Sequence, residues 1–118
     1  MILADTSVWI DHLRTSDARL ADLLLEAQVL CHPFVIGELA CGALKRRAEI
    51  LSLLKQLPHA AALTGDDVLT FVEVNSLMGK GLGWVDVHLL ASAYVSGSQL
   101  WTRDRRLAEA ARRLGTAA

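Results

Sequence analysis

The chain has 118 residues, 53% of them hydrophobic, so we expect one domain over residues 1–118 with a substantial core. The mean hydropathy of +0.34 suggests that a partner or a second copy covers some apolar surface. No apolar run reaches about 18 residues and no signal-like segment opens the chain, so we expect a cytoplasmic protein without a membrane span. The net charge of −1 argues neither for nor against binding to nucleic acid. Cys31 and Cys41 lack CxxC spacing, and we expect two buried thiols.

Short apolar runs that alternate with helical patterns predict an α/β protein. The expected elements are a strand over 1–4, helices over 7–13 and 17–28, a strand over 29–32, helices over 33–43 and 45–57, a strand over 59–63, helices over 64–79 and 84–95, a strand over 99–102 and a helix that Asp104 opens. Ser7 can cap the first helix, and Thr64 with Asp67 forms a capping box. The order fits a three-layer α/β/α sandwich with a short central parallel sheet.

Four carboxylates occupy positions that point to one metal site. Asp5 ends the first predicted strand and Asp104 follows the last, and functional groups gather at the carboxyl ends of parallel strands. Glu38 and Asp86 border the apolar stripes of their helices, where isolated charges are costly unless they are paired or bind cations. Each acid alone has a structural explanation, such as capping a helix, but the set favours a shared site.

An oxygen-rich site with few nearby His or Cys residues favours Mg²⁺ or Mn²⁺ over Zn²⁺. Such ions activate water and neutralise the charge of a phosphodiester. Thr6, Ser7 and Thr102 flank the acids, and their hydroxyls can either hold the site in place or cap helices. Two basic clusters can attract phosphate backbones, with a solvated helix face as the alternative. One is at residues 45–47, and the other comprises Arg103, Arg105, Arg106, Arg112 and Arg113, of which Arg103, Arg105 and Arg106 are the expected RNA contacts.

Other residue types give weaker signals. No pair among the four histidines has the spacing of a metal-binding motif, so we expect partly buried or surface histidines. Trp84 and Trp101 can stack a nucleobase, but their apolar segments favour core packing. The glycine turn over 79–83 lacks the spacing of a phosphate-binding loop.

The segments ILADTSVWIDHL, ELACG, WVDVHLLASA and WTRDRRL, in this order and spacing, resemble the PIN-domain ribonucleases over nearly the whole chain. The short form resembles the VapC toxins of toxin–antitoxin pairs. The resemblance implies a PIN-like fold that hydrolyses single-stranded or structured RNA at a Mg²⁺ or Mn²⁺ site. By the same resemblance, Asp5 and Asp86 ligate the metal, Glu38 ligates it or positions the attacking water, and Asp104 completes the site.

The resemblance also implies supporting roles and partners. Ser7 and Thr102 are the expected supporting hydroxyls, and a small antitoxin protein is expected to cover the active-site groove, in a homodimer or a toxin–antitoxin hetero-oligomer. Two departures from the family pattern stand out. The chain ends soon after the last helix, so a final edge strand is expected to be absent or truncated, and Leu107 replaces the usual aromatic residue.

Two other classes of protein gather acids around Mg²⁺. A phosphoacceptor signalling module needs a lysine late in the chain, but the last lysine is Lys80. A phosphatase of the haloacid-dehalogenase type needs a second aspartate where Ser7 stands. A PIN-like fold kept only for protein binding is a third alternative, against which the presence of all four acids argues.

Overall fold

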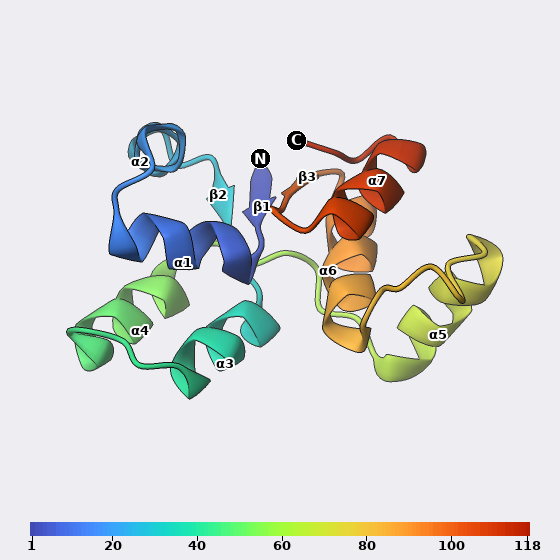
Figure 1. Cartoon of the computed structure of the whole chain (residues 1–118), viewed down its shortest axis with the longest axis horizontal. Coiled ribbons are helices and arrows are strands. Elements are labelled where there is room, and N and C mark those ends of the chain that lie inside the picture. The colour runs from blue at the N-terminus through green and yellow to red at the C-terminus, as the bar shows by residue number, and fades with distance from the viewer.

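A short parallel sheet with helices on both faces forms the centre of the molecule (Figure 1). The computed structural model describes all residues, 1–118. The strands are β1 (Ile2–Ala4), β2 (Val29–Leu30) and β3 (Gln99–Trp101), in the order β2-β1-β3. The helices are α1 (Thr6–Arg14), α2 (Ala18–Leu25), α3 (Pro33–Cys41), α4 (Arg47–Gln56), α5 (Gly65–Val74), α6 (Trp84–Val95) and α7 (Arg105–Arg113). The predicted three-layer parallel α/β fold is confirmed.

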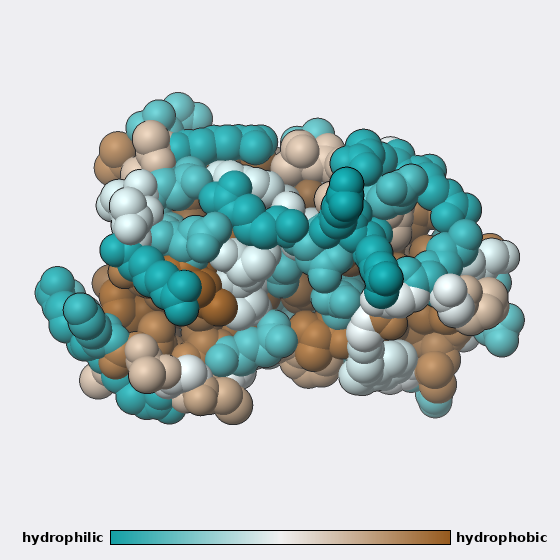
Figure 2. Space-filling view, viewed as in Figure 1, coloured by the Kyte–Doolittle hydropathy of each residue, from teal (hydrophilic) through white to brown (hydrophobic).

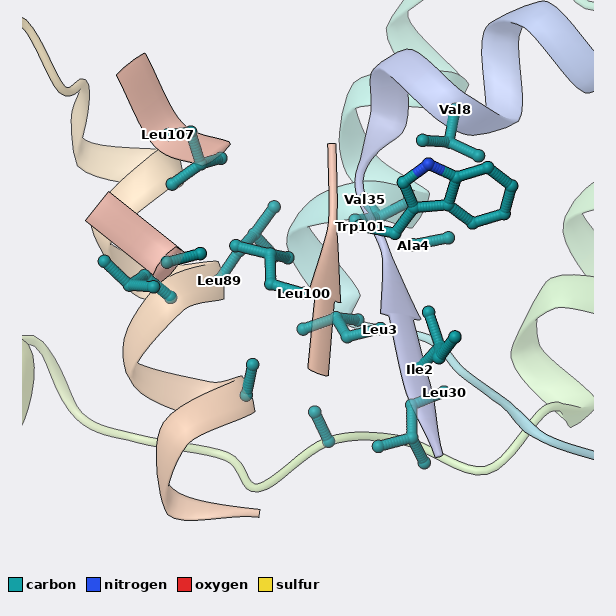
Figure 3. Close-up of a cluster of buried hydrophobic side chains, with 14 of the residues drawn as sticks. Ile2, Leu3, Ala4, Val8, Leu30, Val35, Leu89, Leu100, Trp101 and Leu107 are labelled. Carbon is teal, nitrogen blue, oxygen red and sulfur yellow. The ribbon is translucent and has the colours of Figure 1, made fainter. Parts of the chain in front are cut away.

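The strands are buried on both faces because their side chains alternate between two helical layers. Leu3 pairs with Leu100, and Ala4 pairs with Trp101. Figure 3 shows Leu100 pointing toward Leu89 and Leu107 on the α6 and α7 side, whereas Trp101 and Ala4 point to the side of α1. A strand covered on both faces reads as a continuous apolar run, as the opening residues of the chain do.

The helices divide into two groups around the sheet. In Figure 1, α1 to α4 lie to one side of β1 and β3, and α5 to α7 lie to the other. Hydrophilic side chains cover α7, and hydrophobic side chains are visible between α1 and α4 (Figure 2). None of the seven helices has the length and apolar character needed to cross a membrane.

Several predicted boundaries differ from those in the structure. The strand predicted over 59–63 is reduced to a single bridge between Cys31 and His59, because three consecutive alanines follow and alanine has low strand propensity. The helix predicted over 64–79 ends at Val74, and the helix predicted from residue 45 begins at Arg47. The final edge strand was expected to be absent or truncated, and it is present only as one parallel bridge between Leu100 and Ala117.

Candidate active site

Asp5 and Asp104 lie at the carboxyl ends of two adjacent parallel strands, as the sequence predicts. Asp5 directly follows β1, and its backbone N–H still bonds to the Trp101 carbonyl of β3 at 2.9 Å. Each acid also caps a helix. The Asp5 carboxylate accepts from the Thr6 N–H at 2.7 Å, and the Asp104 carboxylate accepts from two N–H groups at the start of α7. Asp5, and not Ser7 as predicted, is therefore the N-cap of α1.

Two hydroxyls donate to the same oxygen of the Asp5 carboxylate. Thr102 Oγ1 donates to Asp5 Oδ2 at 2.7 Å, and Ser7 Oγ donates to the same oxygen at 3.0 Å. The Asp104 N–H in turn donates to Thr102 Oγ1 at 3.0 Å. These bonds connect segments almost a hundred residues apart in the chain, so the buried Asp5 carboxylate is held in a single orientation.

Glu38 and Asp86 approach the same region from α3 and α6. Glu38 is exposed, and its Oε1 accepts from Thr6 Oγ1 at 2.6 Å. Asp86 is half-buried in the first turn of α6, where its Oδ2 accepts from the Gly83 N–H at 2.9 Å. Thr6 is thus the residue that connects Glu38 to the start of α1.

The four acids act on one another electrostatically. Burial raises the pKa of Asp86 above its ordinary value, and the negative charges of Asp104, Asp5 and Glu38 raise it further, against the bond from Gly83. None of the four forms a salt bridge, although other acids of the chain pair with arginine. The molecule therefore carries a group of mutually repelling carboxylates without a basic partner.

The donor set fits a hard divalent cation. Glu38, Asp86 and Asp104 each keep one carboxylate oxygen that accepts no hydrogen bond from the protein. In the arrangement of the side chains, no three of the chain's His, Cys, Asp or Glu groups converge closely enough to enclose one ion. Binding therefore requires these carboxylates to rotate toward the cation, and an all-oxygen set is suited to Mg²⁺ or Mn²⁺.

The predicted arginine cluster divides into two parts. The Arg103 guanidinium bonds to Asp11 and Asp17, both at 2.9 Å, and lies 5.5 Å from the centre of the Trp101 ring. The hydrogen bond from the Leu20 N–H, together with the bond and charge of Arg103, lowers the pKa of Asp17. Arg103 therefore joins the loop after β3 to α1 and to the start of α2.

Arg105 and Arg106 instead line an open hollow on α7. We call it the cationic hollow, and its charged lining is Lys80, Arg105, Arg106, Glu109 and Arg113. Gly81, at a φ of +75°, allows the Arg106 side chain to cross the turn, since a Cβ there would lie 2.3 Å from the guanidinium. Arg113 belongs to the predicted arginine cluster, whereas the position of Lys80 beside these arginines was not predicted. The glycine turn beside Lys80 is the one signal that could have indicated a close approach.

A second hollow lies between one side of α3, from its first to its last turn, and the first turn of α6, next to Glu38. We call it the aromatic hollow, and its lining includes Phe34, Gly37, Glu38, Cys41, Trp84 and Val85.

The core packing predicted for Trp101 is confirmed, whereas Trp84 is 46% exposed and the same prediction for it is wrong. Trp84 is exposed because it opens α6, and the first turn of a helix has few neighbours on its outer side. Cys31 is buried, as predicted, whereas Cys41 is exposed and the same prediction for it is wrong.

Two of the four histidines are buried, contrary to expectation. His32 Nδ1 accepts from the Phe34 N–H at 3.0 Å and so caps α3, while His88 contacts both Phe34 and Trp84. Burial lowers the pKa of His32 to about 4, helped by the charges of His88 and His59. Burial also lowers the pKa of His88. Both rings are therefore neutral at pH 7, and they serve packing and capping.

Comparison with known proteins places this geometry in context. The model of the family described as PIN domain matches residues 2–113. Ribonuclease VapC32, recorded for two strains of Mycobacterium tuberculosis, is 52% identical to this chain over 118 residues, which cover 99% of the chain and 95% of the relative. Each of the four segments on which the resemblance was based falls within the matched range.

Proposed function

The chain belongs to the PIN-domain family, and on that premise we propose that it is a metal-dependent endoribonuclease and the toxin of a VapBC-type toxin–antitoxin pair. The single observation that carries the proposal is the group of four unpaired acids at the carboxyl edge of the sheet. RNA, single-stranded or structured, is the substrate class. The cytoplasmic location and the single domain over 1–118 are part of the same proposal.

We assign each acid a role from its environment. Asp5 and Asp86 ligate the cation directly, Glu38 ligates it or positions the attacking water, and Asp104 completes the site. Ser7 and Thr102 keep the Asp5 carboxylate in place through the two bonds to Oδ2. When bound, Mg²⁺ or Mn²⁺ lowers the pKa of water and neutralises charge on the phosphodiester.

The residues of the chain itself supply the rest of the site. The exposed Glu38 keeps Oε2 free of protein donors, so this oxygen can accept a proton from a water molecule in the site. Arg105 and Arg106, with Lys80 and Arg113, offer positive charge beside Asp104 for the flanking phosphates. Arg103 is committed to Asp11 and Asp17, so we assign it to the scaffold of the site.

Protein partners follow from the same family. A small antitoxin that covers the acids would inhibit the enzyme, and a homodimer or a toxin–antitoxin hetero-oligomer would bury apolar surface. Leu25 and Val74 are 87% and 75% exposed, which is a high cost for large aliphatic side chains in water.

Cleavage of a labelled RNA by the purified protein tests the proposal. We expect cleavage with Mg²⁺ or Mn²⁺, none with a chelator, and none by Asp86→Asn or Glu38→Gln. Asp22→Asn, an exposed acid of α2, is the matched control and should keep full activity. Equal cleavage by wild type and Asp86→Asn would refute the assignment of the acids.

A further inference from the structure

The proposed chemistry leaves the aromatic hollow between α3 and α6 unused. Two of its features connect it to the acids. Glu38 lines the hollow directly, and Trp84 lies two residues before Asp86 in the first turn of α6. A molecule bound at the acids would therefore extend into the hollow or pass beside it.

The aromatic walls of the hollow are exposed but held in place. Trp84 and Phe34 are 46% and 36% exposed. The buried His88 ring supports both, with centroid distances of 4.6 Å to Trp84 at 88° and 4.5 Å to Phe34 at 56°. Rings fixed in this way lose little freedom when a ligand stacks on them, which favours binding.

Gly37 keeps the hollow open between these walls. Glycine in the middle of a helix destabilises it relative to alanine, so its position within α3 calls for an explanation. Packing does not supply one, because a Cβ built at Gly37 would meet no atom within 4 Å. The missing side chain leaves space in the lining of the hollow, which a larger residue would fill.

We propose that the aromatic hollow binds one nucleobase of the RNA, adjacent to the phosphodiester at the acids. The inference rests on the proposed ribonuclease function. Glu38 is the only charged residue in the lining, and its carboxylate repels phosphate, so the hollow suits the uncharged part of a nucleotide. The cationic hollow, whose lining includes Arg105 directly after Asp104 in the chain, suits the phosphates. Stacking on aromatic side chains is a general way to hold unpaired bases.

Cleavage kinetics on a scanned substrate test this inference. One labelled single-stranded RNA is compared with versions that carry a single abasic ribonucleotide at successive positions. We expect one abasic position to lower the kcat/KM of the wild type by roughly 5- to 100-fold, the range expected for loss of one stacked base. Trp84→Ala and Gly37→Leu should lose a similar factor on the intact RNA, and the abasic position should then cost nothing more.

Two variants serve as controls. Trp84→Phe retains a ring for stacking and should recover most of the kcat/KM. Tyr94→Ala removes an equally exposed aromatic ring from the far end of α6 and should behave as wild type. Melting temperatures of all variants establish that each one is folded, and Gly37→Leu is expected to fold because a Cβ at this position meets no atom within 4 Å.

Three outcomes would overturn the inference. The first is that no abasic position affects the wild type, and the second is that Trp84→Ala cleaves RNA as well as Tyr94→Ala does. The third is that Trp84→Ala and Gly37→Leu keep full kcat/KM but lose binding to the antitoxin protein, in which case the hollow is a protein-docking surface. In all three, the wild type still cleaves RNA, so the proposed function survives. If the wild-type protein cleaves no RNA, both the proposed ribonuclease function and the proposed base-binding site are refuted.

Discussion

Asp5 caps a helix, and in the proposed site it would also ligate the cation, two roles that the sequence presented as alternatives. It caps α1 through the Thr6 N–H, and it stands among the acids with its other oxygen bound by two hydroxyls. An N-cap at the end of a buried strand is fixed by backbone geometry, so a carboxylate there is already oriented for binding. Structural and functional readings of a single acid are therefore compatible in this molecule.

Replacement of Asp5 by asparagine separates the two roles. Asparagine caps a helix about as well as aspartate, and the change removes one of four repelling charges. Metal-free Asp5→Asn should melt at or above the wild-type temperature, whereas the increase in Tm that millimolar Mn²⁺ gives the wild type should be largely lost. Calorimetry with and without Mn²⁺ measures both. A clearly destabilised variant that keeps the full increase would show that Asp5 is a cap alone.

The arginines of the last segment should also differ from one another. Arg105→Gln together with Arg106→Gln should weaken RNA binding and reduce the slope of log affinity against log salt by about 1.4, since each contact to a single strand contributes about 0.7. Arg103→Gln should leave that slope unchanged and lower the Tm slightly, because it breaks bonds to Asp11 and Asp17 that are worth at most about 1 kcal/mol each. Titration of RNA into each variant at several salt concentrations measures the affinity and its slope. If Arg103→Gln reduces the slope and the double variant of Arg105 and Arg106 does not, then Arg103 contacts the RNA and the other two arginines do not.

At the scale of elements, the sequence predicted helix starts better than helix ends and strands. The capping box of Thr64 and Asp67, the cap at Asp17 and the start at Trp84 were predicted correctly because their signals lie within one turn. The prediction of a strand over 59–63 was wrong, because the three alanines after His59 have low strand propensity and only the bridge from His59 to Cys31 forms. The end of α5 at Val74 carries no proline or glycine signal of its own.

The start of α3 makes the stability of the fold depend on pH. The His32 Nδ1 accepts from the Phe34 N–H, so the proton of the neutral ring sits on Nε2, 3.2 Å from Ser92 Oγ. Protonation of Nδ1 would break the cap and bury a charge. Burial keeps the folded-state pKa near 4, against 6.5 for a free histidine, so the unfolded chain binds the proton more readily.

The free energy of unfolding should therefore decrease as the pH falls from 6.5 to 4, by about 3 kcal/mol at most from this group. Above pH 6.5 the contribution is fully present. His32→Asn keeps a capping acceptor but cannot titrate, so its profile should be flatter in this window. Urea unfolding of wild type and His32→Asn across the range measures the difference. Identical slopes for wild type and His32→Asn would contradict the role given to His32.

At the scale of the whole molecule, the four acids were predictable and their surroundings were not. Each acid is next to a strand end or an apolar stripe, and these are patterns of sequence. The commitment of Arg103 to α1 and α2, the position of Lys80 beside Arg106, and the exposure of Trp84 arise only when separate segments pack together. Surfaces made by tertiary contact therefore could not be predicted from the sequence, whereas the positions of the four acids could, and their catalytic role stays a prediction.

The four acids are proposed to bind one shared cation, and Mn²⁺ binding tests this most directly. Titration of Mn²⁺ into the metal-free protein, followed by electron paramagnetic resonance, measures this without reference to RNA. The wild type and Asp22→Asn should bind Mn²⁺ alike, and Asp86→Asn and Asp104→Asn should each bind it at least about tenfold more weakly, because each removes a ligand oxygen from the same ion. Equal Mn²⁺ affinity in wild type, Asp86→Asn and Asp104→Asn would contradict the shared site.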